Sequence, residues 1–280
     1  MPIFDFTSIP LATLLIVGVV LMLASVLQST VGFAAGLFGI PLLTLAAGLT
    51  LPEAVMTMLL ASILQNAGGV LHLRSEFRLG DSLGPLVIRL AAIPPGIVAL
   101  RWATDLPQQT VKAMLGVVLL ALVLLQIFFA PRQPVTLRPI WMWIAFIASG
   151  FFVGFVGMGG PPMVLWVMAQ PWSSQRSRAF LFLMFLSSLV PHVVLLHWML
   201  GDQVDRALPL ALAGVPWIVV GTVVGLRLGA LLPKEKLRAI AYAILVVTAL
   251  SAMAAPLVPH EEVGADELVA PADSDNGVAP

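Results

Sequence analysis

The chain has 280 residues, of which 60% are hydrophobic and 10% charged, and its 14 basic residues balance its 14 acidic ones. A soluble domain is typically about 45–50% apolar and about 25% charged, so this composition excludes a water-soluble globular protein. The absence of cysteine excludes disulfides and thiolate metal sites. Apolar runs of roughly 20 residues match helices that cross a bilayer. We therefore predict an all-α polytopic membrane protein.

Ten apolar segments follow one another along the chain. No basic residue precedes the first, which is interpreted as a retained helix rather than a cleaved signal peptide. Two segments, 37–49 and 160–170, are too short for an ordinary crossing and are typical of re-entrant or broken helices, which leaves about eight full spans. The segments lie at 11–31, 37–49, 54–73, 83–101, 110–130, 140–156, 160–170, 178–199, 207–230 and 237–256.

These segments form two membrane units between a short N-terminal piece and a C-terminal tail. The tail carries six acidic residues and neither Lys nor Arg, so we predict that it is disordered and solvated. The predicted boundaries are 1–10, 11–130 for the first unit, 131–139 for the connecting loop, 140–258 for the second unit, and 259–280 for the acidic tail.

The two units repeat each other. The run GLFGIP at 36–41 aligns with GMGGPP at 157–162, and the same offset of 121 residues pairs Pro95 with Pro216. Several such matches occur in the same order along the chain, which indicates internal duplication. The sequence therefore predicts two homologous units of five segments each.

The distribution of basic residues predicts how the units are oriented. If all ten segments cross, the units are inverted and both termini lie outside. One side then carries ten basic residues and the other carries three, as the positive-inside rule expects. If the two short segments do not cross, the units are parallel and the split is five against eight. We favour inverted units, with Arg74, Arg78, Arg132, Arg138, Arg176, Arg178, Arg227, Lys234, Lys236 and Arg238 on one side and Arg101, Lys112 and Arg206 on the other.

Gly- and Pro-rich clusters beside the two short segments predict a substrate site near the membrane midplane. Glycine lets the backbone approach a ligand, and helix N-termini favour anions. The alternative is that these glycines serve close helix packing. The candidate binding residues are Gln28, Ser29, Thr30, Gly36 and Gly39 in the first unit, and Gly157, Gly159, Gly160 and Pro161 in the second.

The run from Gly154 to Pro162, GFVGMGGPP, resembles the TauE/SafE sulfite exporter family, as do its weaker partner at 32–41 and the twofold hydropathy profile. The resemblance covers about residues 10–256. It implies a multi-pass transporter of the bacterial plasma membrane that moves sulfite, sulfoacetate or related organic anions. The first-unit motif has Leu37-Phe38 where the second has Met158-Gly159, so the two half-sites need not contribute equally.

Polar side chains within the apolar segments are further candidates. Arg89 lies inside the 83–101 segment, where a base should face a cavity or a partner, and its fork of donors suits an oxyanion. The alternative is that Arg89 snorkels to the nearby interface. Four other side chains either line the substrate path or bond neighbouring helices, and His192 is also a candidate for proton coupling. These four are Gln65, Asn66, Ser187 and His192.

Nothing in the sequence indicates an enzyme, a cofactor, a metal site or nucleic-acid binding. We predict a secondary transporter in the lipid bilayer that moves a small anion by alternating access, with the substrate held between the two half-sites. A coupling proton or cation and the oligomeric state stay open. The alternatives are a passive anion channel and a non-transporting membrane scaffold or assembly subunit.

Overall fold

The computed structural model describes residues 9–32, 34–77, 79–131, 133, 137–231 and 233–257. The described residues form ten α-helices and no strand, and eight helices are long and apolar enough to cross a membrane. The prediction of an all-α polytopic protein is therefore confirmed, whereas the acidic tail lies outside the described residues. The helices are α1 (Leu11–Val31), α2 (Ala35–Leu45), α3 (Leu51–His72), α4 (Leu79–Thr104), α5 (Gln108–Phe129), α6 (Pro139–Val156), α7 (Gly160–Met168), α8 (Ser174–Leu200), α9 (Ala207–Leu231) and α10 (Lys234–Ala254).

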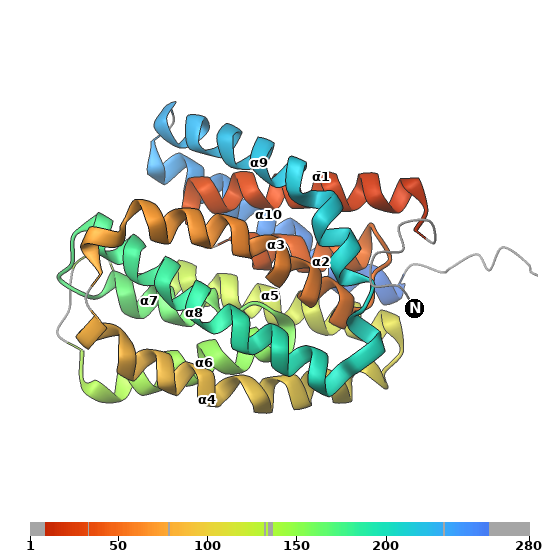
Figure 1. Ribbon diagram of the computed structural model, residues 1–280, viewed down its shortest axis with the longest axis horizontal. Coiled ribbons are helices and arrows are strands. Elements are labelled where there is room, and N and C mark those ends of the chain that lie inside the picture. Colours follow the sequence, from red (N-terminus) through yellow and green to blue (C-terminus); the bar gives the residue numbers. More distant parts are fainter. Residues whose placement is uncertain are drawn as a thin grey trace, which may run out of the picture.

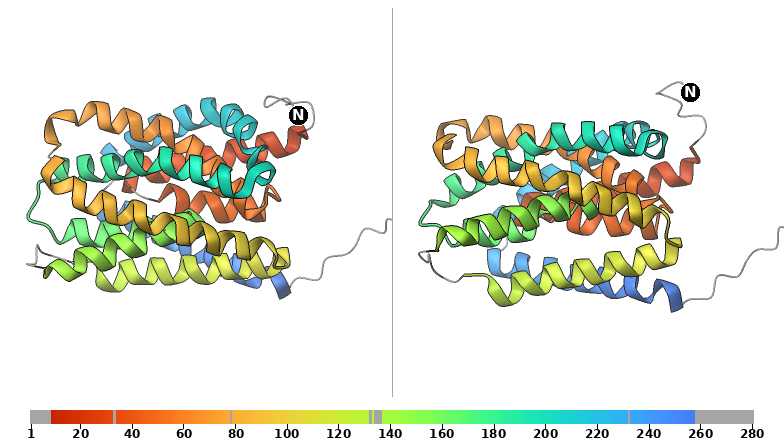
Figure 2. Two further views of the ribbon diagram at one scale, coloured as in Figure 1. Left: turned by 60° about the horizontal axis from the view of Figure 1, so that its bottom comes forward. Right: turned by 90° about the horizontal axis from the view of Figure 1, so that it is seen from below.

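The axes of the helices are roughly aligned with one another (Figure 1). Short connections make consecutive helices antiparallel, so odd-numbered and even-numbered helices run in opposite directions. The start of α1 and the end of α10 therefore lie at the same end of the bundle, as both views of Figure 2 also show. The units α1–α5 and α6–α10 consequently enter the bundle from opposite ends, which is the arrangement expected of inverted units.

The two short helices, α2 and α7, extend only about halfway across the bundle. α2 has 11 residues and α7 has 9, which at about 1.5 Å per residue is roughly half of a 30 Å hydrocarbon core. The α1–α2 and α6–α7 pairs therefore form hairpins that return to the end of the bundle they came from. Their tips meet in the interior, where a Cβ built on Gly36 would lie 2.9 Å from the carbonyl oxygen of Gly157.

The packing of the helices has the symmetry that a duplicated chain would have. The helix α1 packs against α9, and its equivalent α6 packs against α4; likewise α3 packs against α8 and α5 against α10. Exchanging the first five helices for the second five leaves this pattern unchanged. The pattern supports duplication, which stays a prediction.

Glycines bring the helices of the two largest interfaces close together. In the α1–α9 interface, a Cβ on Gly221 would lie 2.2 Å from the carbonyl oxygen of Met22. In the α4–α6 interface, a Cβ on Gly154 would lie 2.3 Å from the carbonyl oxygen of Ile93. Small residues at such contacts allow membrane helices to approach closely. The packing alternative therefore applies to Gly154, which lies at the start of the predicted motif.

We expect Gly221→Ala to destabilise the protein by about 1–3 kcal/mol, because the added methyl group meets backbone that cannot move aside cheaply. Unfolding in detergent, followed by circular dichroism during denaturant titration, measures the effect. Gly84→Ala is the matched control, since a Cβ there meets no atom within 4 Å. Equal stability of the two variants would contradict the close α1–α9 contact.

Candidate functional site

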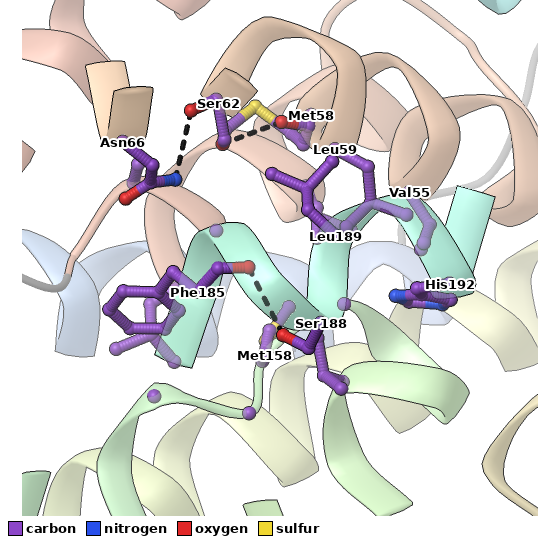
Figure 3. A pocket seen from close by; sticks show the side chains of 18 of the residues that line it. Val55, Met58, Leu59, Ser62, Asn66, Met158, Phe185, Ser188, Leu189 and His192 are labelled. Atoms are coloured by element: carbon purple, nitrogen blue, oxygen red, sulfur yellow. Dashed lines mark hydrogen bonds between the residues drawn. The ribbon is translucent and has the colours of Figure 1, made fainter. Parts of the chain in front are cut away.

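A cavity of about 70 Å³ lies where the two hairpin tips meet α3, α4 and α8 (Figure 3). A single water needs about 10–15 Å³, so this cavity has room for a small anion or several waters. Both units contribute to it. Its lining residues are Gln28, Ala35, Gly36, Leu37, Ile40, Val55, Met58, Leu59, Ser62, Asn66, Arg89, Val153, Gly157, Met158, Gly159, Gly160, Phe185, Ser188, Leu189 and His192.

The structure brings most of the sequence-predicted site residues together in this cavity. They come from both hairpin tips and from three of the long helices, although the sequence separates the first from the last by more than half of the chain. Their role in binding stays a prediction. The predicted residues that line the cavity are Gln28, Gly36, Asn66, Arg89, Gly157, Gly159, Gly160 and His192.

The other predicted site residues do not line the cavity. Gln65 donates a hydrogen bond of 2.9 Å from Nε2 to the Thr222 hydroxyl on α9, so it joins two helices. The Thr30 hydroxyl donates to the carbonyl of Leu27 within its own helix. The remaining four, which also lie outside the lining, are Ser29, Gly39, Pro161 and Ser187.

Arg89 is buried, with 1% of its surface exposed. Because α4 begins at Leu79, Arg89 lies deeper in its helix than the apolar segment indicated. Its Nη1 donates to the sulfur of Met163 at 3.1 Å, and its guanidinium carbon lies 5.4 Å from the centre of the Phe185 ring. No ion pair joins it to a carboxylate within the described ranges. A buried cation of this kind favours an anionic partner.

Three buried polar atoms of the cavity have no hydrogen-bond partner among the described residues: Nε of Arg89, Oδ1 of Asn66 and Nε2 of His192. Asn66 uses its amide nitrogen to donate to the carbonyl of Ser62 at 2.8 Å. Figure 3 shows Asn66 on α3 and His192 on α8 at opposite ends of the group of labelled residues. Since buried polar atoms are normally hydrogen-bonded, this concentration of unpaired atoms indicates that the cavity receives a polar ligand or ordered water.

Two side chains at equivalent positions hold the hairpin turns. Gln28 Oε1 accepts a hydrogen bond of 3.1 Å from the amide of Ala35, the first residue of α2. Ser149, 121 residues later, donates from its hydroxyl to the carbonyl of Gly159 at 2.5 Å. Gly157 ends α6 with φ of 70°, in the left-handed region that glycine adopts without strain. The tips are therefore fixed by contacts within each hairpin.

The helices α2 and α7 both begin at a residue that lines the cavity, Ala35 and Gly160 respectively. A helix N-terminus carries a partial positive charge that favours anions. No side chain caps the start of α7, at Gly160. Pro161 and Pro162 have no N–H, so among the first three residues of α7 only Gly160 has an amide to donate.

Sequence reasoning missed the apolar wall of the cavity. Val55, Leu59, Phe185 and Leu189 belong to it, and Met163, which is outside the lining, accepts a hydrogen bond from Arg89. These residues lie within apolar segments, where nothing in the sequence separates a cavity-facing residue from a lipid-facing one. The Ser62 and Ser188 hydroxyls also line the cavity, but both donate to carbonyls of their own helices.

Comparison with known proteins found one family. A family model described as "Sulfite exporter TauE/SafE" matches residues 16–252. The matched range includes every residue that lines the cavity. No curated protein and no solved structure matches the chain.

Proposed function

We propose a carrier function from the premise that this chain belongs to the TauE/SafE sulfite exporter family, which is a family of membrane transporters rather than enzymes. The chain is a multi-pass membrane protein with eight helices of spanning length. In our proposal it is a secondary transporter that carries a small anion across the bacterial plasma membrane by alternating access. The anion is sulfite, an organosulfonate or a related carboxylate.

The observation that carries this proposal is an unpaired Arg89 inside a cavity between two hairpin tips. Among the described residues the guanidinium has no carboxylate partner and its Nε has no hydrogen-bond partner, so donors other than the one bonded to Met163 are available to an oxyanion. The hairpins enter from opposite ends of the bundle, so each tip can be uncovered toward one face in turn. Inverted units with broken helices around a midplane site are the architecture of alternating-access carriers.

The N-terminal half of α3 favours a carrier function over a channel function. Residues 51–59 of this helix are all buried, on every side of the helix. A passive channel needs a continuous water path, whereas the cavity here is closed along this half of α3. The cavity with its buried cation in turn favours a transporter over a scaffold, because a scaffold has no use for an unpaired charge that costs stability.

Counterflow in proteoliposomes tests the proposed function. Purified protein is reconstituted in vesicles loaded with unlabelled sulfite, and uptake of radiolabelled sulfite from outside is followed. We expect internal sulfite to accelerate the uptake, because the loaded site returns faster than the empty one. Sulfite flux without such acceleration would indicate a channel. Absence of flux for sulfite, sulfonates and carboxylates would favour the scaffold.

Cysteine labelling tests the orientation. The chain has no cysteine of its own, so Ser75→Cys and Gln203→Cys each provide a single thiol. Ser75 and Gln203 are exposed and lie at opposite ends of the bundle, the first at the end rich in Arg and Lys. We expect a membrane-impermeant maleimide to label Gln203→Cys in intact cells and Ser75→Cys only after permeabilisation. The opposite result would reverse the orientation.

A further inference from the structure

The cavity contains one fixed charge. Within the part of the chain that the structure describes, its ionisable lining residues are Arg89 and His192, and no carboxylate lines it. On α3 and α4 the carboxylates of Glu53 and Asp81 are ion-paired with Arg206 and Arg176. Each pair lies at the start of its helix, and because α3 and α4 are antiparallel these two starts are at opposite ends of the bundle, away from the cavity lining. Both pairs therefore leave the charge of Arg89 uncompensated.

The helix N-termini add little to this charge. The amide of Ala35 at the start of α2 already donates to Gln28, and two of the first three residues of α7 are prolines without an N–H. Each terminus therefore presents fewer free amides than an ordinary helix start would. His192 is the other ionisable residue of the lining, and the charge count takes it as neutral beside the Arg89 cation.

From this charge count we propose that the site selects anions by charge, taking singly charged oxyanions and excluding doubly charged ones of the same size, such as sulfate. Sulfite is then carried as hydrogensulfite, its singly charged form, which coexists with the doubly charged ion near neutral pH. This inference rests on the proposed carrier function. A single negative charge at Arg89 makes the closed site neutral. A second one is left without a partner in a buried site, which is strongly unfavourable.

The shape of the cavity adds to the selection. Val55, Leu59 and Leu189 belong to the apolar wall of the cavity. An oxyanion that carries a small apolar group in place of its fourth oxygen can bury that group against this wall. Methanesulfonate and sulfate differ in this respect and in charge, while both are tetrahedral and of similar size. They therefore report charge and the apolar wall together, and perchlorate, a tetrahedral anion with one charge and no apolar group, is added to separate the effect of charge.

Competition against sulfite counterflow tests the proposal. Methanesulfonate and sulfate are added outside the proteoliposomes at neutral pH, where the first carries one charge and the second two. We expect sulfate to need a concentration at least about 100-fold higher for half-inhibition, since its second charge stays unpaired. Thermal stabilisation of the purified protein by each anion measures binding without any flux. We expect methanesulfonate to stabilise the protein at lower concentrations than sulfate does.

The possible outcomes separate the two proposals. Strong competition by methanesulfonate with none by sulfate supports charge selection. Equal competition and equal stabilisation by both anions would overturn it and leave the carrier function standing. Absence of counterflow together with absence of stabilisation by either anion would overturn the carrier function, and the charge selection with it.

Three variants separate charge from structure. Arg89→Lys keeps one positive charge, so we expect weaker binding with the preference for methanesulfonate retained. His192→Gln removes the second ionisable group, and the ratio of the two half-inhibition concentrations should not change. A large shift of that ratio in His192→Gln would show a second charge and overturn the proposal. Arg101→Gln, at the exposed end of the same helix, should behave as the unchanged protein does.

Discussion

Replacing Arg89 with glutamine should abolish sulfite counterflow while the protein stays folded in the membrane. Truncating one partner of a buried, hydrogen-bonded charge pair costs about 2–5 kcal/mol of binding, or roughly 30-fold to several thousand-fold in affinity. Stability should stay equal or rise, because the variant no longer buries a cation without a carboxylate. The measurements are the counterflow rate and the melting temperature of the purified variant.

The same change at the exposed Arg101 of α4 controls for loss of a positive charge on that helix. Unchanged counterflow in Arg89→Gln would remove Arg89 from the binding site. Loss of both flux and fold would instead show that the Met163 and Phe185 contacts of Arg89 serve structure.

Replacing Gly36 with valine should also abolish transport, through contact between the hairpin tips. A Cβ at residue 36 would lie 2.9 Å from the carbonyl oxygen of Gly157, which is closer than real contacts allow. The branched side chain has to separate the tips or enter the cavity, and in either case it removes space from the substrate. We expect counterflow below about a hundredth of the normal rate, with a loss of stability of about 1–3 kcal/mol.

The matched control is Gly68→Val on α3, where a Cβ meets no atom within 4 Å. It adds the same side chain to the same protein, so it reports any general cost of valine in a membrane helix. Normal counterflow in Gly36→Val would show that the tips do not meet around the substrate.

Much of the fold could be predicted from the sequence because the bilayer imposes simple rules. Apolar runs long enough to span the bilayer predicted the eight long helices, and two runs too short to span it predicted α2 and α7. The bounds were less accurate. The third segment was predicted from residue 54, but α3 begins at Leu51. There Thr50 and Glu53 cap the helix reciprocally, so a proline and a carboxylate fit into its first turn.

The site was harder to predict because the sequence does not define how each helix is rotated. Gln65 and Asn66 are neighbours, yet about 100° of helix rotation separates their side chains. Asn66 consequently lines the cavity, while Gln65 bonds α9. The sequence could predict the polar residues within apolar segments and the Gly-rich tips as site residues, because both interrupt the apolar pattern of membrane helices. It could not predict Val55 or Leu189, because these apolar residues fit the pattern of a membrane helix. They differ from lipid-facing residues only in the side of the helix on which they lie.

The solitary guanidinium of Arg89 has a consequence for what drives the transport cycle. With an anion bound, both faces can shut around a neutral pair, whereas the vacant protein has to shut around a bare cation. In the proposed cycle we therefore expect the return step without bound anion to be the slow one. In the proposed carrier this favours exchange of one anion for another, in which the gradient of the second anion drives the movement of the first.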